Sequence, residues 1–132
     1  MSKFKKRLQK TFSTQFNAVV YGTGFGYLEE ILDVFSTVFV LDDQPNVKKK
    51  NLVFLEKGSD LNILQEIKVI FIDRNKVNDI DYLIPIIKKH RPDIAIEGND
   101  ALEREYSKTI YASGYFYRDS QGIFHTWGLG KK

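Results

Sequence analysis

Short apolar segments with the composition of buried β-strands recur along this sequence, and this recurrence is the feature that most restricts the fold. They occupy residues 17–21, 37–41, 51–55, 69–72 and 93–97. Segments with helical spacing separate several of them: Leu28, Ile31, Leu32 and Phe35 follow the i, i+3, i+4, i+7 pattern of a buried helix face. Strands that alternate with helices predict an open, mostly parallel sheet with helices on both faces.

Three further helices are predicted with weaker signals. One short helix is expected over residues 61–66, and one begins near Asn78 and should be kinked or shortened by Pro85. A third is expected over residues 101–111.

The last part of the chain differs in kind. Residues 115–117 and 123–127 have the composition of strands, and residues 118–122 between them have the composition of a turn, so a terminal antiparallel hairpin is expected. The sequence therefore predicts an α/β fold: a single Rossmann-like three-layer sandwich whose mostly parallel sheet ends in a C-terminal antiparallel hairpin.

Length and composition set the outer limits. At 132 residues the chain suits one domain, and its 42% hydrophobic and 28% charged residues exclude a disordered chain. The absence of cysteine excludes disulfides and thiolate metal sites, and the two histidines form no zinc motif, so no metal is expected. No apolar run is long enough to span a bilayer, and a cytoplasmic location is expected.

The amino terminus carries a basic cluster. Phe4, Leu8, Phe12 and Phe16 recur at every fourth position among lysines, which predicts a basic amphipathic helix over residues 1–16, ahead of a core over 17–132. Such a helix is either an arm that contacts a polyanion or a membrane surface, or a helix that docks on the sheet and leaves its lysines in water. The second interpretation is favoured.

Polar and glycine residues follow the predicted strands, where the ligands of parallel sheets bind. Gly22, Gly24 and Gly26 follow the first strand, so the backbone can turn tightly and approach a ligand. The later strands are followed by Asp42 and Asp43, by Ser59 and Asp60, by Asp73, and by Glu97, Asn99 and Asp100. This acidic rim suits ribose hydroxyls, an adenine amino group or a cationic ligand.

The spacing of the glycines discriminates between ligands. A dinucleotide-binding G-x-G-x-x-G loop that starts at Gly22 needs its third glycine where Tyr27 stands, which argues against NAD or FAD. The sequence has G-x-G-x-G instead. With the residues before it, Val19-Val-Tyr-Gly-Thr-Gly-Phe-Gly26, this segment resembles the first motif of the class I S-adenosylmethionine-dependent methyltransferases.

The resemblance to this family extends over nearly the whole chain. It includes the acid-ended second strand 39–42, the segment 58–60, the fourth strand 69–73 and the terminal hairpin, which is similar to the family's reversed last strands. It implies S-adenosyl-L-methionine as cofactor, with the glycine loop at its amino-acid end, Asp42 at the ribose, Asp60 at the adenine and Asp73 beside the methyl-transfer site. The implied binding residues are Tyr21, Gly22, Thr23, Gly24, Gly26, Asp42, Asp43, Ser59, Asp60 and Asp73.

Methyl transfer relies mostly on positioning, and no catalytic residue is assigned. Asp73, Glu97 and His125 are the candidates for a general base, although a structural role is favoured for His125. Structural roles also explain several of the acids: Asp42 and Asp43 suit a solvated turn, Asp60 a helix cap and Asp73 the start of a turn.

Two alternatives stay open beside a methyltransferase with an unidentified acceptor. Val20 stands where the family usually has an acid, which favours a catalytically inactive Rossmann-like module that binds a partner protein or nucleic acid. The third hypothesis is an NAD- or sugar-nucleotide-binding domain. Aromatic residues in the terminal hairpin also suit self-association into a homo-oligomer.

Overall fold

The computed structural model describes residues 3–11, 15–22, 28–41, 44–73, 76, 81–96, 117–118 and 123–125. In chain order its elements are α1 (Lys3–Thr11), β1 (Asn17–Tyr21), α2 (Leu28–Val34), β2 (Val38–Leu41), β3 (Leu52–Leu55), the 3₁₀ helix η1 (Leu61–Ile63), β4 (Ile67–Ile72), α3 (Ile84–His90), β5 (Asp93–Ile96), β6 (Tyr117–Arg118) and β7 (Ile123–His125). No described helix is long and apolar enough to cross a bilayer.

The strands form one sheet in the order β3-β2-β1-β4-β5-β7-β6. The first five are parallel, which confirms the α/β prediction, and β7 pairs antiparallel with both β5 and β6. Because the central strands are paired on both sides and covered on both faces, they are continuously apolar. All four residues of β2 are buried, for example.

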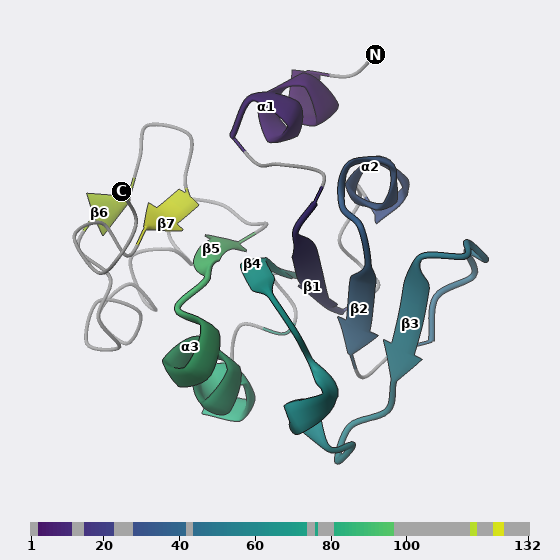
Figure 1. Ribbon diagram of the computed structural model, residues 1–132, viewed down its shortest axis with the longest axis vertical. Helices are drawn as coiled ribbons and strands as arrows, with labels where there is room; N and C mark the ends of the chain where they lie inside the picture. The colour runs from purple at the N-terminus through teal and green to yellow at the C-terminus, as the bar shows by residue number, and fades with distance from the viewer. Residues whose placement is uncertain are drawn as a thin grey trace.

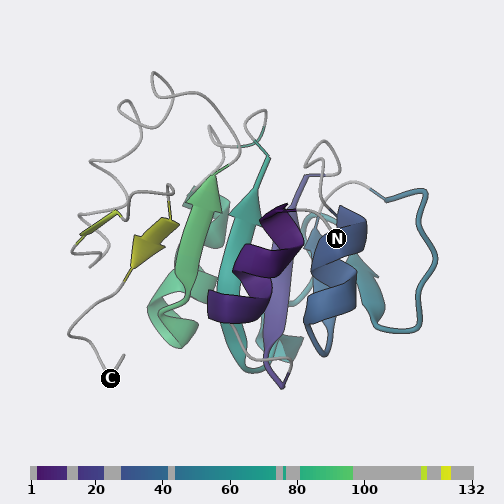
Figure 2. The same cartoon turned by 90° about the horizontal axis from the view of Figure 1, so that it is seen from above.

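Helices lie on both faces of this sheet, as Figures 1 and 2 show: α1 and α2 cover one face, and α3 lies on the other. Each face has its own apolar core because successive side chains of a strand point to opposite faces. In β1, Val19 and Tyr21 belong to the core under α3, whereas Ala18 and Val20 belong to the core under α1 and α2. The Rossmann-like three-layer arrangement is thus present in the described residues.

The amino-terminal helix is shorter than predicted. It ends at Thr11, and Gln15 and Phe16 lie in a turn and a bend, whereas the sequence predicted a helix to residue 16. Hydroxyl and β-branched residues in this stretch compete with the helical backbone and lower its helix propensity. Leu8 is buried in the core with α2, so the helix does dock on the sheet.

The short helix predicted over residues 61–66 was too long. Residues 61–66 form only the one-turn helix η1, because Glu66 has a positive φ of 53° that a helix does not accept, and β4 starts directly after it. The start of the helix expected from Asn78 falls on residues 77–80, which lie outside the described residues. Residues 81–83 form a 3₁₀ turn that leads directly into α3, and Pro85 lies in the first turn of α3. Proline has no N–H to donate, and the N–H groups in the first turn of a helix have no helical acceptor, so proline is tolerated at this position.

The terminal hairpin is described in part. Within 117–118 and 123–125, Tyr117 pairs with His125 and Arg118 with Phe124, both antiparallel, and Arg118 lies in a strand where a turn was expected. The residues that would close the hairpin, and the predicted helix 101–111, lie outside the described residues. The closed hairpin and the self-association through it therefore stay predictions.

The last residue of α3 gives a pH-dependent prediction. Burial lowers the pKa of His90 below its ordinary value of 6.5, and the charge of Lys89 lowers it further. The unfolded chain then binds more protons than the folded one as pH falls through 6.5, so His90 should destabilise the protein on acidification. His90→Gln should flatten the dependence of the unfolding free energy on pH between about 7.5 and 5.5. Urea denaturation at several pH values tests this, and an unchanged pH profile would contradict it.

Candidate functional site

The strand order reverses between β1 and β4. From β1 the chain runs outward through β2 to β3, then returns to the other side of β1 to form β4 and β5. Ligands of open α/β sheets bind outside the carboxyl ends of the strands at this reversal, where the connections diverge and leave a crevice. The residues at that place are Tyr21, the last residue of β1, Gly22 directly after it, and Asp73 directly after β4.

Gly22 is packed against the end of β4. Its φ of 98° is a conformation that side chains rarely adopt, and a Cβ atom there would lie 2.6 Å from Asp73 Cβ and 2.7 Å from Lys76 Cγ. The absence of a side chain at Gly22 therefore lets Asp73 and Lys76 lie against the backbone of β1. The first glycine of the motif is required by this internal contact, whatever the loop after it binds.

Asp73 is held in place by its own backbone. Its N–H donates to the Tyr21 carbonyl at 2.9 Å, and its carbonyl accepts from the Lys76 N–H at 2.8 Å, which closes a turn. The residue is 4% exposed. The structural role that the sequence suggested for Asp73, as the start of a turn, is present, and the turn fixes a carboxylate at the β1–β4 crevice.

Tyr21, whose carbonyl accepts the Asp73 N–H, forms an aromatic pair with Tyr82, and only Tyr21 was predicted from the sequence. Tyr21 is fully buried, and its ring centroid lies 5.7 Å from that of Tyr82, which precedes α3. Lys76 Nζ lies 6.0 Å from the Tyr21 ring, and Lys57 Nζ lies 5.7 Å from the Tyr82 ring. Tyr82 was hidden within a predicted helix, and only the three-dimensional fold brings it to the site.

Tyr82 also connects the loop after β3 to the site. The Gly58 N–H donates to the Tyr82 hydroxyl at 3.3 Å, so this loop and the connection before α3 are joined above the sheet edge. Ser59, the next residue, is half-buried, and its N–H donates to the Glu56 carbonyl in a turn. The loops after β1, β3 and β4 are therefore linked through Tyr82, Tyr21 and Lys76.

Asp60 caps a helix, as its structural interpretation predicted. Its Oδ1 accepts a hydrogen bond from the Asn62 N–H at 2.9 Å at the start of η1. The residue is exposed, and its second carboxylate oxygen makes no hydrogen bond to the described part of the chain. Capping and ligand binding are therefore compatible at this residue.

The other predicted site residues lie outside the described residues: Thr23, Gly24, Gly26, Asp42, Asp43, Glu97, Asn99 and Asp100. His125 lies in β7, but its side chain is not described. Of the predicted residues that are described, the fold brings Tyr21, Gly22 and Asp73 into direct contact. Among the described residues no group of histidine and carboxylate side chains could hold a metal ion.

Comparisons with known proteins show which solved structure this architecture resembles. No protein-family model matches the sequence, and no curated protein matches it. Among solved structures, the chain is similar to the precorrin-6y C5,15-methyltransferase from Geobacter metallireducens GS-15, with a TM-score of 0.64 over 92% of this chain and 80% of that one. The sequences are 12% identical, so the likeness shows the fold alone. The chain thus has a methyltransferase-like, Rossmann-like α/β fold.

Proposed function

We propose that this protein binds S-adenosyl-L-methionine at the carboxyl ends of β1, β2, β3 and β4 and transfers its methyl group to an acceptor that is not identified. The observation that carries the proposal is the contact of Gly22 with Asp73 where the strand order reverses. That contact joins the glycine-rich segment and the acid-ended strand that resemble the methyltransferase motifs. The structural likeness to a methyltransferase supports the same fold-level assignment.

The described residues fit the chemistry of this cofactor. Adenosylmethionine is a nucleoside with a sulfonium and an ammonium group, so it needs acceptors for an amino group and hydroxyls, and negative charge near its cationic end. Asp60 has a carboxylate oxygen available at the end of β3, and Asp73 holds a carboxylate at the crevice. Asp42, which follows β2 and lies outside the described residues, is the proposed ligand of the ribose.

Each residue then has a role in binding or orientation. When bound, the cofactor supplies a methyl group on sulfur that a nucleophile can accept. Gly22 allows β1 and β4 to close against each other, the Asp73 turn fixes its carboxylate, and Tyr82 holds the loop after β3 in place. Positioning of this kind supplies most of the acceleration in a displacement that needs little covalent work by the protein.

Calorimetric titration with S-adenosylmethionine and S-adenosylhomocysteine tests this proposal. We expect micromolar binding of at least one, and a roughly ten-fold weaker affinity for Asp42→Ala and Asp60→Ala, since each loses a charge-assisted hydrogen bond. Asp33→Ala, which removes an exposed carboxylate from α2, is the matched control and should bind like the original protein. Unchanged affinity in both site variants would refute the site, and preferential retention of NADH would refute the cofactor.

One observation favours the inactive binding module as second candidate. Val20 is fully buried in the apolar core under α1 and α2, so this position offers no carboxylate to the ammonium group of a cofactor. If neither ligand produces heat or a thermal shift at millimolar concentration, this candidate replaces the first.

A further inference from the structure

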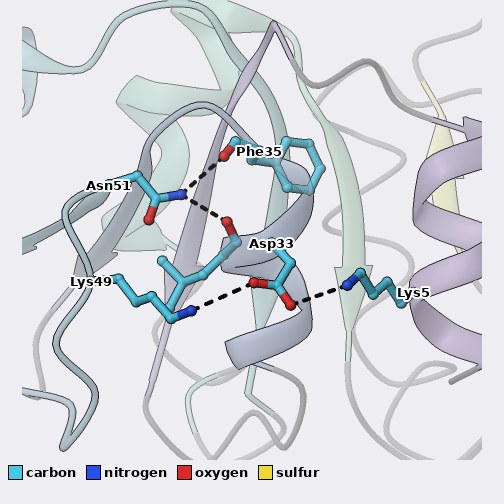
Figure 3. A network of polar contacts seen from close by, with 6 residues as sticks. Lys5, Asp33, Phe35, Lys49 and Asn51 are labelled. Atoms are coloured by element: carbon cyan, nitrogen blue, oxygen red, sulfur yellow. Dashed lines mark hydrogen bonds and ion pairs between the residues drawn. The ribbon is translucent and has the colours of Figure 1, made fainter. Parts of the chain in front are cut away.

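Asp33 joins two basic segments that are far apart in the sequence. Its Oδ2 lies 3.2 Å from Lys5 Nζ of α1, and its Oδ1 lies 3.7 Å from Lys49 Nζ in the connection before β3 (Figure 3). The hydrogen bond and charge of Lys5, followed by those of Lys49, lower the pKa of Asp33, so the carboxylate remains charged in neutral solution. The amino-terminal basic helix and the lysine run 48–50 are thereby held on the same face of the sheet.

The lysine run is also fixed to α2 by Asn51. The Asn51 side-chain amide donates to the Leu32 carbonyl at 2.8 Å and to the Phe35 carbonyl at 3.1 Å (Figure 3). These carbonyls lie at the C-terminal end of α2, where backbone acceptors lack helical partners. The backbone directly after the three lysines is therefore anchored to the C-terminal end of α2.

A pocket of about 520 Å³ lies under this lysine run, at the open edge of the sheet. Val47, Leu52 and Phe54 contribute apolar surface to it, and Lys48, Lys49 and Lys50 line it as well. Its volume is in the range of roughly 300–1,000 Å³ of small-ligand sites. An apolar pocket lined by cations suits a flat, apolar group that carries negative charge at its side.

The charge of this face is unbalanced. The segments α1 and 48–50 contain eight basic residues, whereas α2, which lies between them, contributes Glu29, Glu30 and Asp33. Lys48 and Lys50 are exposed, and within the described ranges neither makes an ion pair. These two lysines are available to bind anions at the pocket.

We propose that this face binds single-stranded nucleic acid, with phosphates on Lys48, Lys50 and the exposed lysines of α1, and one base in the pocket against Phe54. Proteins that bind single-stranded nucleic acid without sequence preference combine basic side chains along the phosphate backbone with aromatic side chains on which bases stack. A duplex would keep its bases out of the pocket. A membrane surface would need an apolar helix face, but Leu8 of α1 is already buried against the sheet.

Fluorescence anisotropy with labelled oligothymidylate of about fifteen nucleotides tests the lysines, without any cofactor present. Lys48→Ala combined with Lys50→Ala should weaken binding about ten-fold and reduce the salt slope by about 1.4, because each contact to a single strand releases roughly 0.7 counterion. Lys88→Ala combined with Lys89→Ala removes the same charge from α3 on the opposite face and should change affinity less than two-fold. Equal losses in both double variants, or none in the first, would overturn the proposal.

The pocket has its own test. Phe54→Leu keeps an apolar side chain in β3 but removes the ring, so binding of oligothymidylate should weaken about five-fold, in line with the loss of one stacked base. Binding of inorganic polyphosphate, which has no bases, should not change. Equal effects on both probes, or tighter binding of duplex than of single strand, would refute the placement of a base in the pocket. Thermal unfolding of each variant checks that the fold is intact.

Discussion

Gly22→Ala should destabilise the protein by about 3 kcal/mol. The new Cβ would meet Asp73 Cβ at 2.6 Å and Lys76 Cγ at 2.7 Å, closer than real Cβ contacts, and the residue keeps a φ of 98°. Positive φ costs a non-glycine residue roughly 1–3 kcal/mol, and forced overpacking costs about 1–3 kcal/mol more. Because Asp73 is tied to the Tyr21 carbonyl, it cannot move without opening the junction of β1 with β4.

Gly58→Ala separates these two causes. Gly58 has a φ of 95°, close to that of Gly22, but nothing lies within 4 Å of the position of its Cβ. Gly58→Ala should therefore lower the free energy of unfolding only by the cost of the positive φ, about 1 kcal/mol. Urea denaturation followed by circular dichroism measures both variants. Equal losses would show that the contact with Asp73 adds nothing to the cost of a side chain at position 22.

Phe71→Ala should cost about 4 kcal/mol, because it empties the centre of the sheet. Phe71 lies in β4 between β1 and β5, is fully buried, and packs under the helix layer of α1 and α2. Loss of a buried phenylalanine costs roughly 3–5 kcal/mol, since the cavity collapses only in part. Phe54→Ala, at the half-buried edge strand β3, should cost no more than about 2 kcal/mol.

A double-mutant cycle refines this prediction. The Phe71 ring contacts that of Phe35 edge-on, with centroids 6.0 Å apart and an interplanar angle of 67°. Such pairs add about 1 kcal/mol beyond burial. The combination of Phe71→Leu with Phe35→Leu should therefore lose about 1 kcal/mol less than the two single changes together. Strict additivity in urea denaturation would show that the two rings act independently.

The central strands were predictable from the sequence for a physical reason. Segments such as 17–21 and 69–72 are buried on both faces, so their composition is continuously apolar and short, and β1 agrees with its prediction at both ends. Helices were predicted less well because local features override periodicity. Glu66 with its positive φ excludes a helix that continues through residue 66, which the spacing of apolar residues does not reveal. Pro85, which was predicted to kink or shorten its helix, lies in the first turn of α3.

From the sequence, only those parts of the candidate site that lie within a single sequence motif were predictable. The motif placed Gly22 and Asp73 at strand ends, but its spacing did not show that one touches the other. Tyr82 and Lys76 follow β1 by about 60 residues in the sequence, and the fold packs them against Tyr21. No local sequence pattern indicates these contacts. No local pattern indicated the ion pairs of Asp33 either, because one lysine partner, Lys5, precedes it and the other, Lys49, follows it in the sequence.

The central position of β1 has a consequence for synthesis of the chain. One side of β1 pairs with β2, but its other side pairs with β4, whose last residue, Ile72, comes about fifty residues later. While a ribosome produces the chain from the amino terminus, β1 therefore remains an unprotected edge until β4 emerges, and an apolar edge strand is a template for aggregation. Nascent chains arrested before residue 67 should therefore need chaperones more than chains arrested well beyond residue 96, in which β4 and β5 have both emerged.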